Sequence, residues 1–345
     1  MSRKFLFYVT QNYSFEILRP LQQAIIEQGH ECAWYAHGDK INRSLFLTSE
    51  TQLPSIQQAV TYAPDATFVP GNVVPDFIPG LKVQVFHGLE HKKKGHFGIR
   101  GFYDLYCTHG PITTSRFQQL ASKHKYFRVV ETGWPKLDTL FSASKLTLDN
   151  PNNLPCILYA PTFSPALTSS AELYDSITAQ IALGSEYWLF KFHPKMSAAL
   201  LAPYQALAEK YDNVYLSTDA SISSALQTAD VILSDTSSVI GEFLLLNKPA
   251  VTFKNSQPGE ELLNFTQAEE LAANLQTALA PSKQLILAIK AANKQLHPFV
   301  DGQSSQRVLD AVEQLIVDKR AGLENKPWNL FRRFKMRKNH HYWRF

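Results

Sequence analysis

The chain has 345 residues, of which 45% are hydrophobic and 19% are charged, as in an ordinary soluble globular protein with room for two domains. The formal net charge of +4 is uneven: residues 319–345 carry nine Lys or Arg and one acid, hence +8, which leaves −4 for residues 1–318. A mildly acidic body argues against binding to nucleic acid, and we expect the basic tail to have a role of its own.

The N-terminus and the cysteines indicate the compartment. The apolar run Phe5–Val9 is too short for a signal sequence or a membrane span. Cys32, Cys107 and Cys156 stand far apart without a CxxC pattern, so reduced thiols are expected. These features predict a cytoplasmic protein.

In the first half of the chain, short apolar runs alternate with helical segments, which indicates parallel βα units. The expected strands lie at residues 5–9, 32–36, 66–70, 83–87, 104–108 and 127–131, and the expected helices at 16–28, 53–60 and 112–122.

Residues 131–155 are rich in turn formers and predict a linker. Beyond it, strands are expected at 156–162, 187–193, 213–217, 230–234 and 250–253, and the last helices at about 282–292 and 306–319. The pattern predicts an α/β protein with two doubly wound domains, residues 1–140 and 141–318, that face a cleft. The basic aromatic tail, residues 319–345, follows them.

Polar residues come directly after four of the expected strands, where doubly wound folds bind ligands. The first is His87, followed by Gly88 and a run of three lysines. It is a candidate general base, because imidazole titrates near neutral pH, or it bonds a loop carbonyl. A zinc site of His87, His91 and His96 is disfavoured because the lysines among them would repel a dication. No DxD-type acidic pair stands out in the sequence, so we expect no essential metal and no cofactor.

The next two strand ends supply Thr162, Lys191 and His193. Thr162 offers a hydroxyl, and Lys191 and His193 alternate with Phe192. A His before Pro is often structural in other proteins. We nevertheless expect His193 to contact a phosphate or a leaving group.

The fourth strand end is a run of five small polar residues that opens a helix: Ser234, Asp235, Thr236, Ser237 and Ser238. Such residues cap helices, but five in succession exceed a cap and suggest an anion site, most often for phosphate. Glu242 lies one turn further on the same face. It can accept hydrogen bonds from ribose hydroxyls or complement the helix dipole.

A last polar group lies in the stretch "DGQSSQR" near the end of the body. Asp301 and Ser304 are candidate helix caps. Arg307, in the first turn of the last body helix, is either a phosphate clamp or a surface charge.

The ordered set "FHG…K", "TGWPKLD", "LYAPTF", "KFHP", "SDTSSVIGEFLLLNKP" and "DGQSSQR" resembles the CDP-glycerol glycerophosphotransferase family, the bacterial teichoic-acid primases and polymerases. The resemblance runs from about Val83 to Arg307. It implies a GT-B architecture of two Rossmann-like domains. It also implies that His87 is the catalytic His, that His193 is the second motif His, and that Ser234–Ser238 and Arg307 contact phosphate.

The resemblance implies transfer of a polyol phosphate from a CDP-polyol, with CDP-glycerol the first choice and CDP-ribitol the second, to a hydroxyl on a polyprenyl-linked or glycan acceptor. CMP would leave. The first alternative is a GT-B glycosyltransferase that uses a nucleotide-sugar donor. The second is a non-catalytic protein that binds nucleotide and docks at a membrane.

The tail interleaves basic and aromatic residues, and Trp328, Phe331 and Phe334 stand at helical spacing. This pattern is typical of an interfacial anchor on anionic lipid and predicts a peripheral protein at the inner face of the cell membrane. The alternatives are a solvated tail and an aromatic flap that packs on the first domain.

Overall fold

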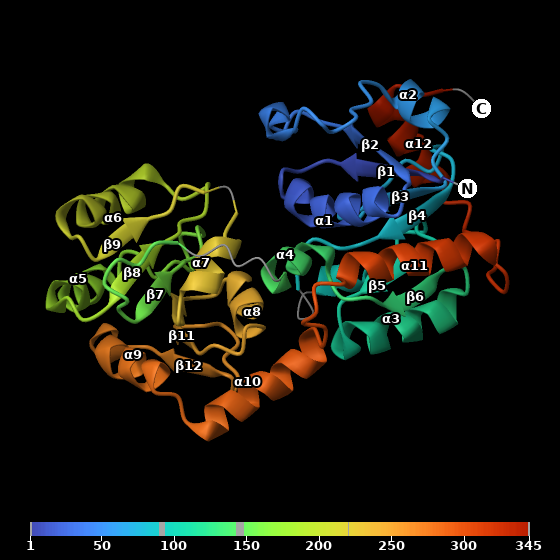
Figure 1. Cartoon of the computed structure of the whole chain (residues 1–345). Helices are drawn as coiled ribbons and strands as arrows, with labels where there is room; N and C mark the ends of the chain where they lie inside the picture. The colour runs from blue at the N-terminus through green and yellow to red at the C-terminus, as the bar shows by residue number, and fades with distance from the viewer. Residues whose placement is uncertain (1, 90–93, 143–147, 220, 344–345) are drawn as a thin grey trace. The chain divides into compact units, whose positions relative to one another are not determined.

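The computed structural model describes residues 2–89, 94–142, 148–219 and 221–343. It divides into two compact units (Figure 1). Unit 1 comprises Met1–Ser142 and Gln295–Phe345, and unit 2 comprises Ala143–Lys294. Each unit has one parallel six-stranded sheet and its own hydrophobic core.

The sheet of unit 1 has the strand order β2-β1-β3-β4-β5-β6, with every pair parallel. Its strands are β1 (Lys4–Val9), β2 (Glu31–Ala36), β3 (Ala66–Val69), β4 (Leu81–Gln84), β5 (Leu105–Thr108) and β6 (Arg128–Glu131). Most strand residues are buried on both faces, as the continuous apolar runs of a parallel sheet require. The order reverses between β1 and β3, which places a ligand crevice at their carboxyl ends.

Helices cover both faces of this sheet. On one face α1 packs against α11, and the core of the other face includes side chains of α2 and α3 together with Tyr342. The helical elements are α1 (Tyr13–Glu27), η1 (Arg43–Leu45), α2 (Ile56–Thr61), η2 (Lys94–Phe97), α3 (Pro111–His124), η3 (Pro135–Leu137), α4 (Asp138–Phe141), α11 (Ser304–Val317) and α12 (Leu330–His340).

The sheet of unit 2 is also parallel, in the order β12-β11-β10-β7-β8-β9. Its strands are β7 (Cys156–Tyr159), β8 (Tyr187–Phe190), β9 (Val214–Leu216), β10 (Val231–Ser234), β11 (Ala250–Phe253) and β12 (Leu262–Phe265). This is the Rossmann order, with the first strand of the unit, β7, beside the fourth, β10. The order therefore reverses between these two strands.

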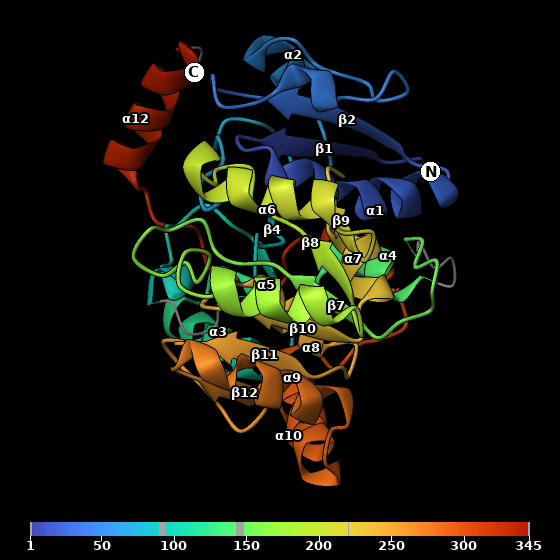
Figure 2. The same cartoon turned by 90° about the vertical axis from the view of Figure 1, so that its left-hand side faces the viewer.

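Alternate residues of the strands in unit 2 face two helical layers. Side chains of α5, α6 and α9 pack against Ile157, Tyr159, Leu233 and their neighbours, whereas α7 and α8 contact the strands separately from that cluster. In Figure 2 α5 lies in front of the β7 and β8 region. The helices are α5 (Tyr174–Leu183), α6 (Ala198–Lys210), α7 (Ser223–Thr228), α8 (Val239–Leu244), η4 (Ala268–Glu270), α9 (Leu271–Leu279) and α10 (Lys283–Leu296).

The structure differs from the expected domain boundaries at the C-terminus. The second domain was expected to run to residue 318, but Gln295–Phe345 belongs to unit 1. The reason is that α11 packs on α1 and the tail bonds residues of the first sheet, as in the hydrogen bond between Tyr8 Oη and His340 Nε2. No helix within the described residues has both the length and the hydropathy that crossing a bilayer requires.

Candidate functional site

His87 lies at the crevice of unit 1. It follows β4, and its Nδ1 is 3.1 Å from the carbonyl oxygen of Pro70, directly after β3. The Tyr13 ring, at the start of α1, stacks on the imidazole with ring centroids 5.3 Å apart and 21° between their planes. His87 therefore lies where the strand order reverses, between elements that follow β1 and β3.

The contact with Pro70 fixes the tautomer of His87. A carbonyl oxygen only accepts hydrogen bonds, so Nδ1 carries the proton and donates it. The other nitrogen, Nε2, then has a free lone pair. A half-buried imidazole oriented in this way can accept a proton at Nε2. The loop-carbonyl bond that was the structural alternative for His87 is thus present.

Arg307 is held in place by two neighbours in unit 1. Its guanidinium forms a forked ion pair with the Asp301 carboxylate, and that pair lowers the pKa of Asp301. The guanidinium also lies 4.1 Å from the centroid of the Phe299 ring. The side chain is only partly buried, so an anion can reach it.

The expected caps of α11 are wrong. Its N-cap is Gln303, which makes no side-chain cap bond. The amides of Ser304 and Ser305 instead donate to the Asp138 carboxylate at 2.8 and 2.7 Å. Burial raises the pKa of that carboxyl. Asp138, from the motif "TGWPKLD", occupies the helix N-terminus, so α11 offers those two amides to no ligand.

In unit 2 the polar run after β10 separates into buried and accessible members. Ser234 Oγ donates to the Ala160 carbonyl at 2.7 Å. The Asp235 carboxylate accepts from the amides of Thr162 and Ser169, at 2.9 and 3.0 Å. Burial raises the pKa of Asp235. Ser234 and Asp235 are fully buried, so they fasten the loop after β7 to β10.

The accessible members of the run are its last residues. Thr236 Oγ1 accepts from the amide of Ser256 at 3.0 Å. Ser238 is the N-cap of α8 but makes no side-chain cap bond. Within the described part of the chain, the hydroxyls of Ser237 and Ser238 bond no other group. Two hydroxyls therefore remain for a ligand at the crevice between β7 and β10.

His193 lies after β8, the next strand along the sheet. Its Nδ1 accepts from the amide of Lys195 at 3.0 Å, so Nε2 carries the proton and can donate. The ring is exposed and lies 4.3 Å from the Phe163 ring between centroids. Partial burial and the nearby Lys195 lower the pKa of His193, which favours the neutral imidazole. A neutral imidazole with its proton on Nε2 is a hydrogen-bond donor to an anion.

The remaining candidates in unit 2 are less available. The Lys191 ammonium donates to the carbonyl of Asp219. Glu242 is 8% exposed, in the first turn of α8. Thr162 is half-buried and its amide is bound to Asp235, whereas its hydroxyl forms no hydrogen bond with the described residues.

The zinc alternative depended on His91 together with His87 and His96. Residues 90–93, which include His91, lie outside the described residues, so the zinc alternative has no geometry here. In the part of the chain that is described, no three His, Cys, Asp or Glu side chains are grouped as a metal would require.

No sequence pattern pointed to the groups that position His87. Pro70 and Tyr13 are distant from it in the chain and reach it only because β3 separates β1 from β4. His109 was also missed. It follows β5, is 1% exposed, and neither ring nitrogen has a hydrogen-bond partner of good geometry among the described residues. Its place after a strand was the available signal.

Solved structures show the fold. The chain superimposes on the wall teichoic acid polymerase TagF with a TM-score of 0.65 at 15% identity, over 91% of this chain and 90% of that one. It also matches a putative UDP-N-acetylglucosamine 2-epimerase from Listeria monocytogenes, with a TM-score of 0.67 at 14% identity, over 95% and 100% of the two chains. These similarities confirm the GT-B-like fold expected from the motifs.

Two curated proteins are similar in sequence. The teichoic acid glycerol-phosphate primase of Bacillus subtilis (strain 168) is 27% identical over 275 residues, which is 68% of each chain. The teichoic acid poly(ribitol-phosphate) polymerase of Bacillus spizizenii is 34% identical over 139 residues, but these are 36% of this chain and only 22% of that protein.

The sequence profile of the CDP-glycerol:poly(glycerophosphate) glycerophosphotransferases matches residues 89–314, well over half of the chain. This match confirms the family that the ordered motifs indicated. The chain therefore belongs to the CDP-glycerol:poly(glycerophosphate) glycerophosphotransferase family, and it is a transferase that moves glycerol phosphate from CDP-glycerol.

Proposed function

We propose that His87 is the general base of this transfer. The acceptor is a hydroxyl of a cell-surface glycopolymer or of its polyprenyl-linked precursor. Its oxygen attacks the β-phosphorus of CDP-glycerol, the bond from that phosphorus to the bridging oxygen breaks, and CMP leaves. The acceptor proton passes to His87 Nε2. The observation that supports this role is the bond from Nδ1 to Pro70, because in the neutral ring it places the proton on Nδ1 and makes Nε2 the acceptor.

In this proposal, neutral hydrogen-bond donors and one partly exposed cation hold the donor diphosphate. The hydroxyls of Ser237 and Ser238 and the Nε2–H of His193 come from neighbouring strand ends of unit 2. Arg307 supplies a cation for the phosphates from its position beside Asp301. Donors fixed in advance of the reaction stabilise developing charge at little reorganisation cost.

The remaining groups of the site serve the donor less directly. Glu242, buried one turn into α8, is proposed to accept from the ribose hydroxyls. Thr162 adds its hydroxyl, and Lys191 adds positive charge near the crevice. Ser234, Asp235 and Thr236 keep the loops after β7, β10 and β11 in place and act on the donor only through that geometry.

The test of this function is a comparison of donors. The protein is incubated with CDP-glycerol, CDP-ribitol and UDP-sugars, with a polyprenyl-linked acceptor, and the products are followed with ³²P in the β-phosphate. We expect CMP release and transfer of the label from CDP-glycerol. Turnover of a UDP-sugar without transfer of label would favour the glycosyltransferase, and binding without any turnover would favour the non-catalytic alternative.

We also propose that the C-terminal segment attaches the enzyme to the inner face of the membrane. Its largest apolar side chains point to solvent: Trp328 is 79% exposed, Phe331 81% and Phe334 58%. Arg332 and Lys335 beside them are exposed as well. Rings at headgroup depth and cations on anionic lipid both favour such docking, at about 1 kcal/mol per cation.

The same segment contacts unit 1 through its opposite side. Met336 and His340 are buried, and Tyr342 stacks on Phe77 with centroids 4.6 Å apart. The tail is thus packed as a flap and still presents an aromatic, basic surface. Packing as a flap is therefore compatible with the proposed role as a membrane anchor, because Trp328, Phe331 and Phe334 stay exposed while Met336 and His340 are buried.

A further inference from the structure

A polar cavity lies at the end of the unit 1 sheet that is remote from His87. It has a volume of about 750 Å³ and is lined by residues that precede β3, β4 and β5, among them Asp65, Gly80 and Asp104. His87 follows the carboxyl end of β4. The cavity therefore opens at the amino ends of the strands, on the edge opposite to His87.

The lining of this cavity carries excess positive charge. Its cations are Lys319 and Arg320 after α11 and Lys326 and Arg333 in the tail, and its acids are Asp65 and Asp104. Four positive and two negative charges leave a net of +2. The proposed mechanism does not use this cationic cavity.

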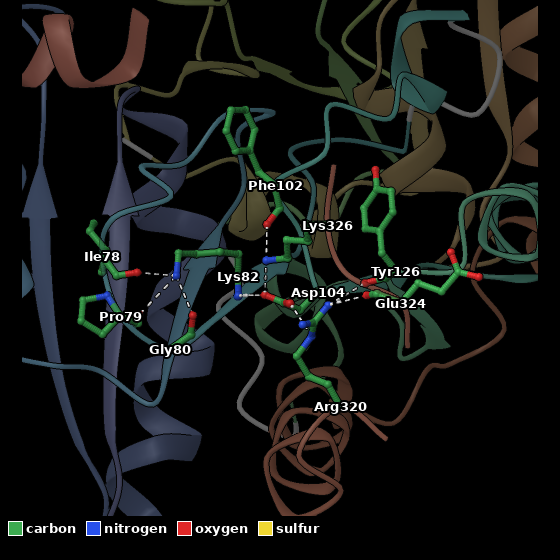
Figure 3. Close-up of polar contacts among 10 residues, drawn as sticks. All are labelled: Ile78, Pro79, Gly80, Lys82, Phe102, Asp104, Tyr126, Arg320, Glu324 and Lys326. Carbon is green, nitrogen blue, oxygen red and sulfur yellow. Dashed lines mark hydrogen bonds and ion pairs between the residues drawn. The ribbon is translucent and has the colours of Figure 1, made fainter. Parts of the chain in front are cut away.

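Figure 3 shows how fully Asp104 is used. Its carboxylate accepts from the Lys82 amide at 2.7 Å and from Lys326 Nζ at 2.6 Å, and Arg320 Nε lies 2.9 Å away. Lys326 and Arg320 are further bonded to backbone carbonyls. The other acid, Asp65, accepts from the Lys4 amide at 2.8 Å. Both acids therefore have hydrogen-bond or ion-pair partners other than the two remaining cations of the lining, Lys319 and Arg333.

Lys319 and Arg333 are the two cations of the lining that do not pair with Asp65 or Asp104, so they are the ones that a ligand would contact. Lys319 is exposed and makes no ion pair with any described residue. Among the described residues Arg333 is paired only with Asp76, at 3.4 Å, and its side chain is 39% exposed. Asp76 does not line the cavity.

The pKa of Lys326 is consistent with an unbalanced positive field. Burial lowers that pKa, the Asp104 carboxylate raises it, and the charges of Arg320 and Arg333 lower it again. The neighbouring cations therefore repel one another in the absence of a ligand, and an anion in the cavity would relieve that repulsion.

A purely structural role accounts for part of the cluster. Arg320 and Lys326 bind the start of the tail to Asp104. The nearby Lys82 ammonium instead donates to the carbonyls of Ile78, Pro79 and Gly80 (Figure 3). A cation after α11 also complements the helix dipole. Neither role requires Arg333, which comes from α12, to line the same cavity.

We propose that this cationic cavity binds a phosphate ester, with Lys319 and Arg333 as the cations that contact the phosphate and Arg320 and Lys326 as the fixed floor beneath them. Such a cluster suits phosphate, because the several acceptor oxygens of one phosphate group can bind N–H donors from more than one cation. The ester can be a soluble glycerol phosphate or the headgroup of an anionic phospholipid, since both present the same group.

The test uses the full chain and two probes. sn-Glycerol 3-phosphate binding is measured by calorimetry at low salt, and sedimentation is measured with phosphatidylglycerol and with phosphatidylcholine vesicles. The variant K319A/R333A removes the two accessible cations. A matched control, K283A/K290A, removes two exposed cations of α10 in unit 2 and leaves the cavity intact.

We expect K319A/R333A to weaken binding at least about tenfold in one or both arms, which corresponds to losing one hydrogen bond to a charged group. The control should bind the probe of that arm as wild type does. Loss in the soluble arm assigns a free phosphate ester, and loss with phosphatidylglycerol vesicles alone assigns a lipid headgroup.

The proposal is overturned if K319A/R333A binds both probes like wild type, or if only the control loses binding. Thermal unfolding of each variant shows whether it is folded. If K319A/R333A is unfolded, the single variant K319E decides, because Lys319 is exposed and unpaired among the described residues. The result does not depend on the catalytic proposal, since turnover is not the readout.

Discussion

The imidazole of His87 is held by a hydrogen bond to Pro70 and by stacking on Tyr13. Replacement of His87 by Ala removes the base and leaves the donor-binding groups of unit 2 unchanged. We expect kcat to fall at least about a hundredfold, with the Kd for CDP-glycerol unchanged in calorimetry. Tyr13→Phe, which keeps the ring, serves as the control and should retain most activity. A His87→Ala enzyme close to wild type would remove this residue from the mechanism.

The polar run after β10 allows binding and structure to be separated by neighbouring substitutions. Ser237→Ala with Ser238→Ala should weaken CDP-glycerol binding by at least about tenfold, since hydrogen bonds to a charged group contribute 1.5–3 kcal/mol. The melting temperature should stay the same, because neither hydroxyl caps α8.

Thr236→Ala is the matched variant for that experiment. It removes the acceptor of the Ser256 amide, so we expect a lower melting temperature and a smaller change in affinity. If the double Ser variant melts lower and binds normally, the two serines have the structural role instead.

At this scale the sequence indicated which residue types gather after strands, and it could not distinguish their roles. Asp235 looked like its neighbours Ser237 and Ser238 in the same run. Its carboxylate is buried because β10 lies beside β7, which brings the amides of Thr162 and Ser169 to it. That pairing is set by strand order, and no local pattern encodes strand order.

At the scale of the element, substitutions in α12 and in the residues before it distinguish attachment to lipid from packing on unit 1. Trp328→Ser with Phe331→Ser changes two side chains that are 79% and 81% exposed. We expect this variant to lose sedimentation with anionic vesicles and to keep its melting temperature.

Met336→Ala is the control for the tail, because Met336 is 6% exposed. It should lower the melting temperature, in line with about 2–5 kcal/mol for truncating a buried Met, and leave the exposed rings in place. Equal vesicle binding by wild type and the Trp328/Phe331 variant would contradict the membrane proposal. Truncation is a poorer test, because it would also remove Arg320 and Lys326 from the buried Asp104.

The docking of α12 should also depend on pH through His340. Its Nε2 and Nδ1 lie 3.1 and 3.2 Å from the hydroxyls of Tyr8 and Tyr35, and the His37 ring is 3.7 Å away between centroids. Burial, then His37 and His341, lowers the pKa of His340 to about 3.

A released helix would have its His340 near the ordinary pKa of 6.5. The released state therefore binds more protons between pH 6.5 and about 3, so docking is complete above pH 6.5 and weakens as the pH falls, by up to about tenfold per pH unit. Hydrogen exchange of the α12 amides at pH 7 and pH 5 measures this. His340→Gln should flatten the dependence, and an unchanged slope in that variant would assign it to His37.

Most elements were predictable because apolar runs and helical periodicity are local. The strands of residues 5–9 and 230–234 are found as β1 and β10 with small shifts at their ends. β12 (Leu262–Phe265) was missed, because three of its four residues are only partly buried at the sheet edge. In the tail, the pattern identified the exposed ring of Phe331, but the buried side of α12 depends on contacts with β1 and β2.

For the whole molecule, the return of the chain to unit 1 makes the two units unequal as folding units. Unit 2 is continuous in sequence, from residue 143 to 294, and has its own core. Unit 1 is discontinuous and takes α11 from the C-terminal part of the chain. Val308, Leu309, Val312 and Leu315 of that helix are 0–1% exposed.

Residues 1–142 alone should therefore not fold. Burial of four aliphatic side chains contributes about 6–12 kcal/mol, which is comparable to the whole stability of a domain. Without α11, the Asp138 carboxylate would also lose the two amides that it accepts from. A cooperative thermal transition in this fragment would contradict the argument.

Residues 143–294 alone should fold and bind the donor. This fragment keeps β7, β8 and β10 with Ser237, Ser238 and His193, and it lacks only Arg307 among the proposed phosphate contacts. We therefore expect its Kd for CDP-glycerol to match that of the full chain carrying Arg307→Ala, both weaker than wild type by about tenfold or more. Calorimetry on the three proteins measures this. A fragment that unfolds cooperatively but binds no CDP-glycerol would show that unit 1 contributes more to the donor site than Arg307 does.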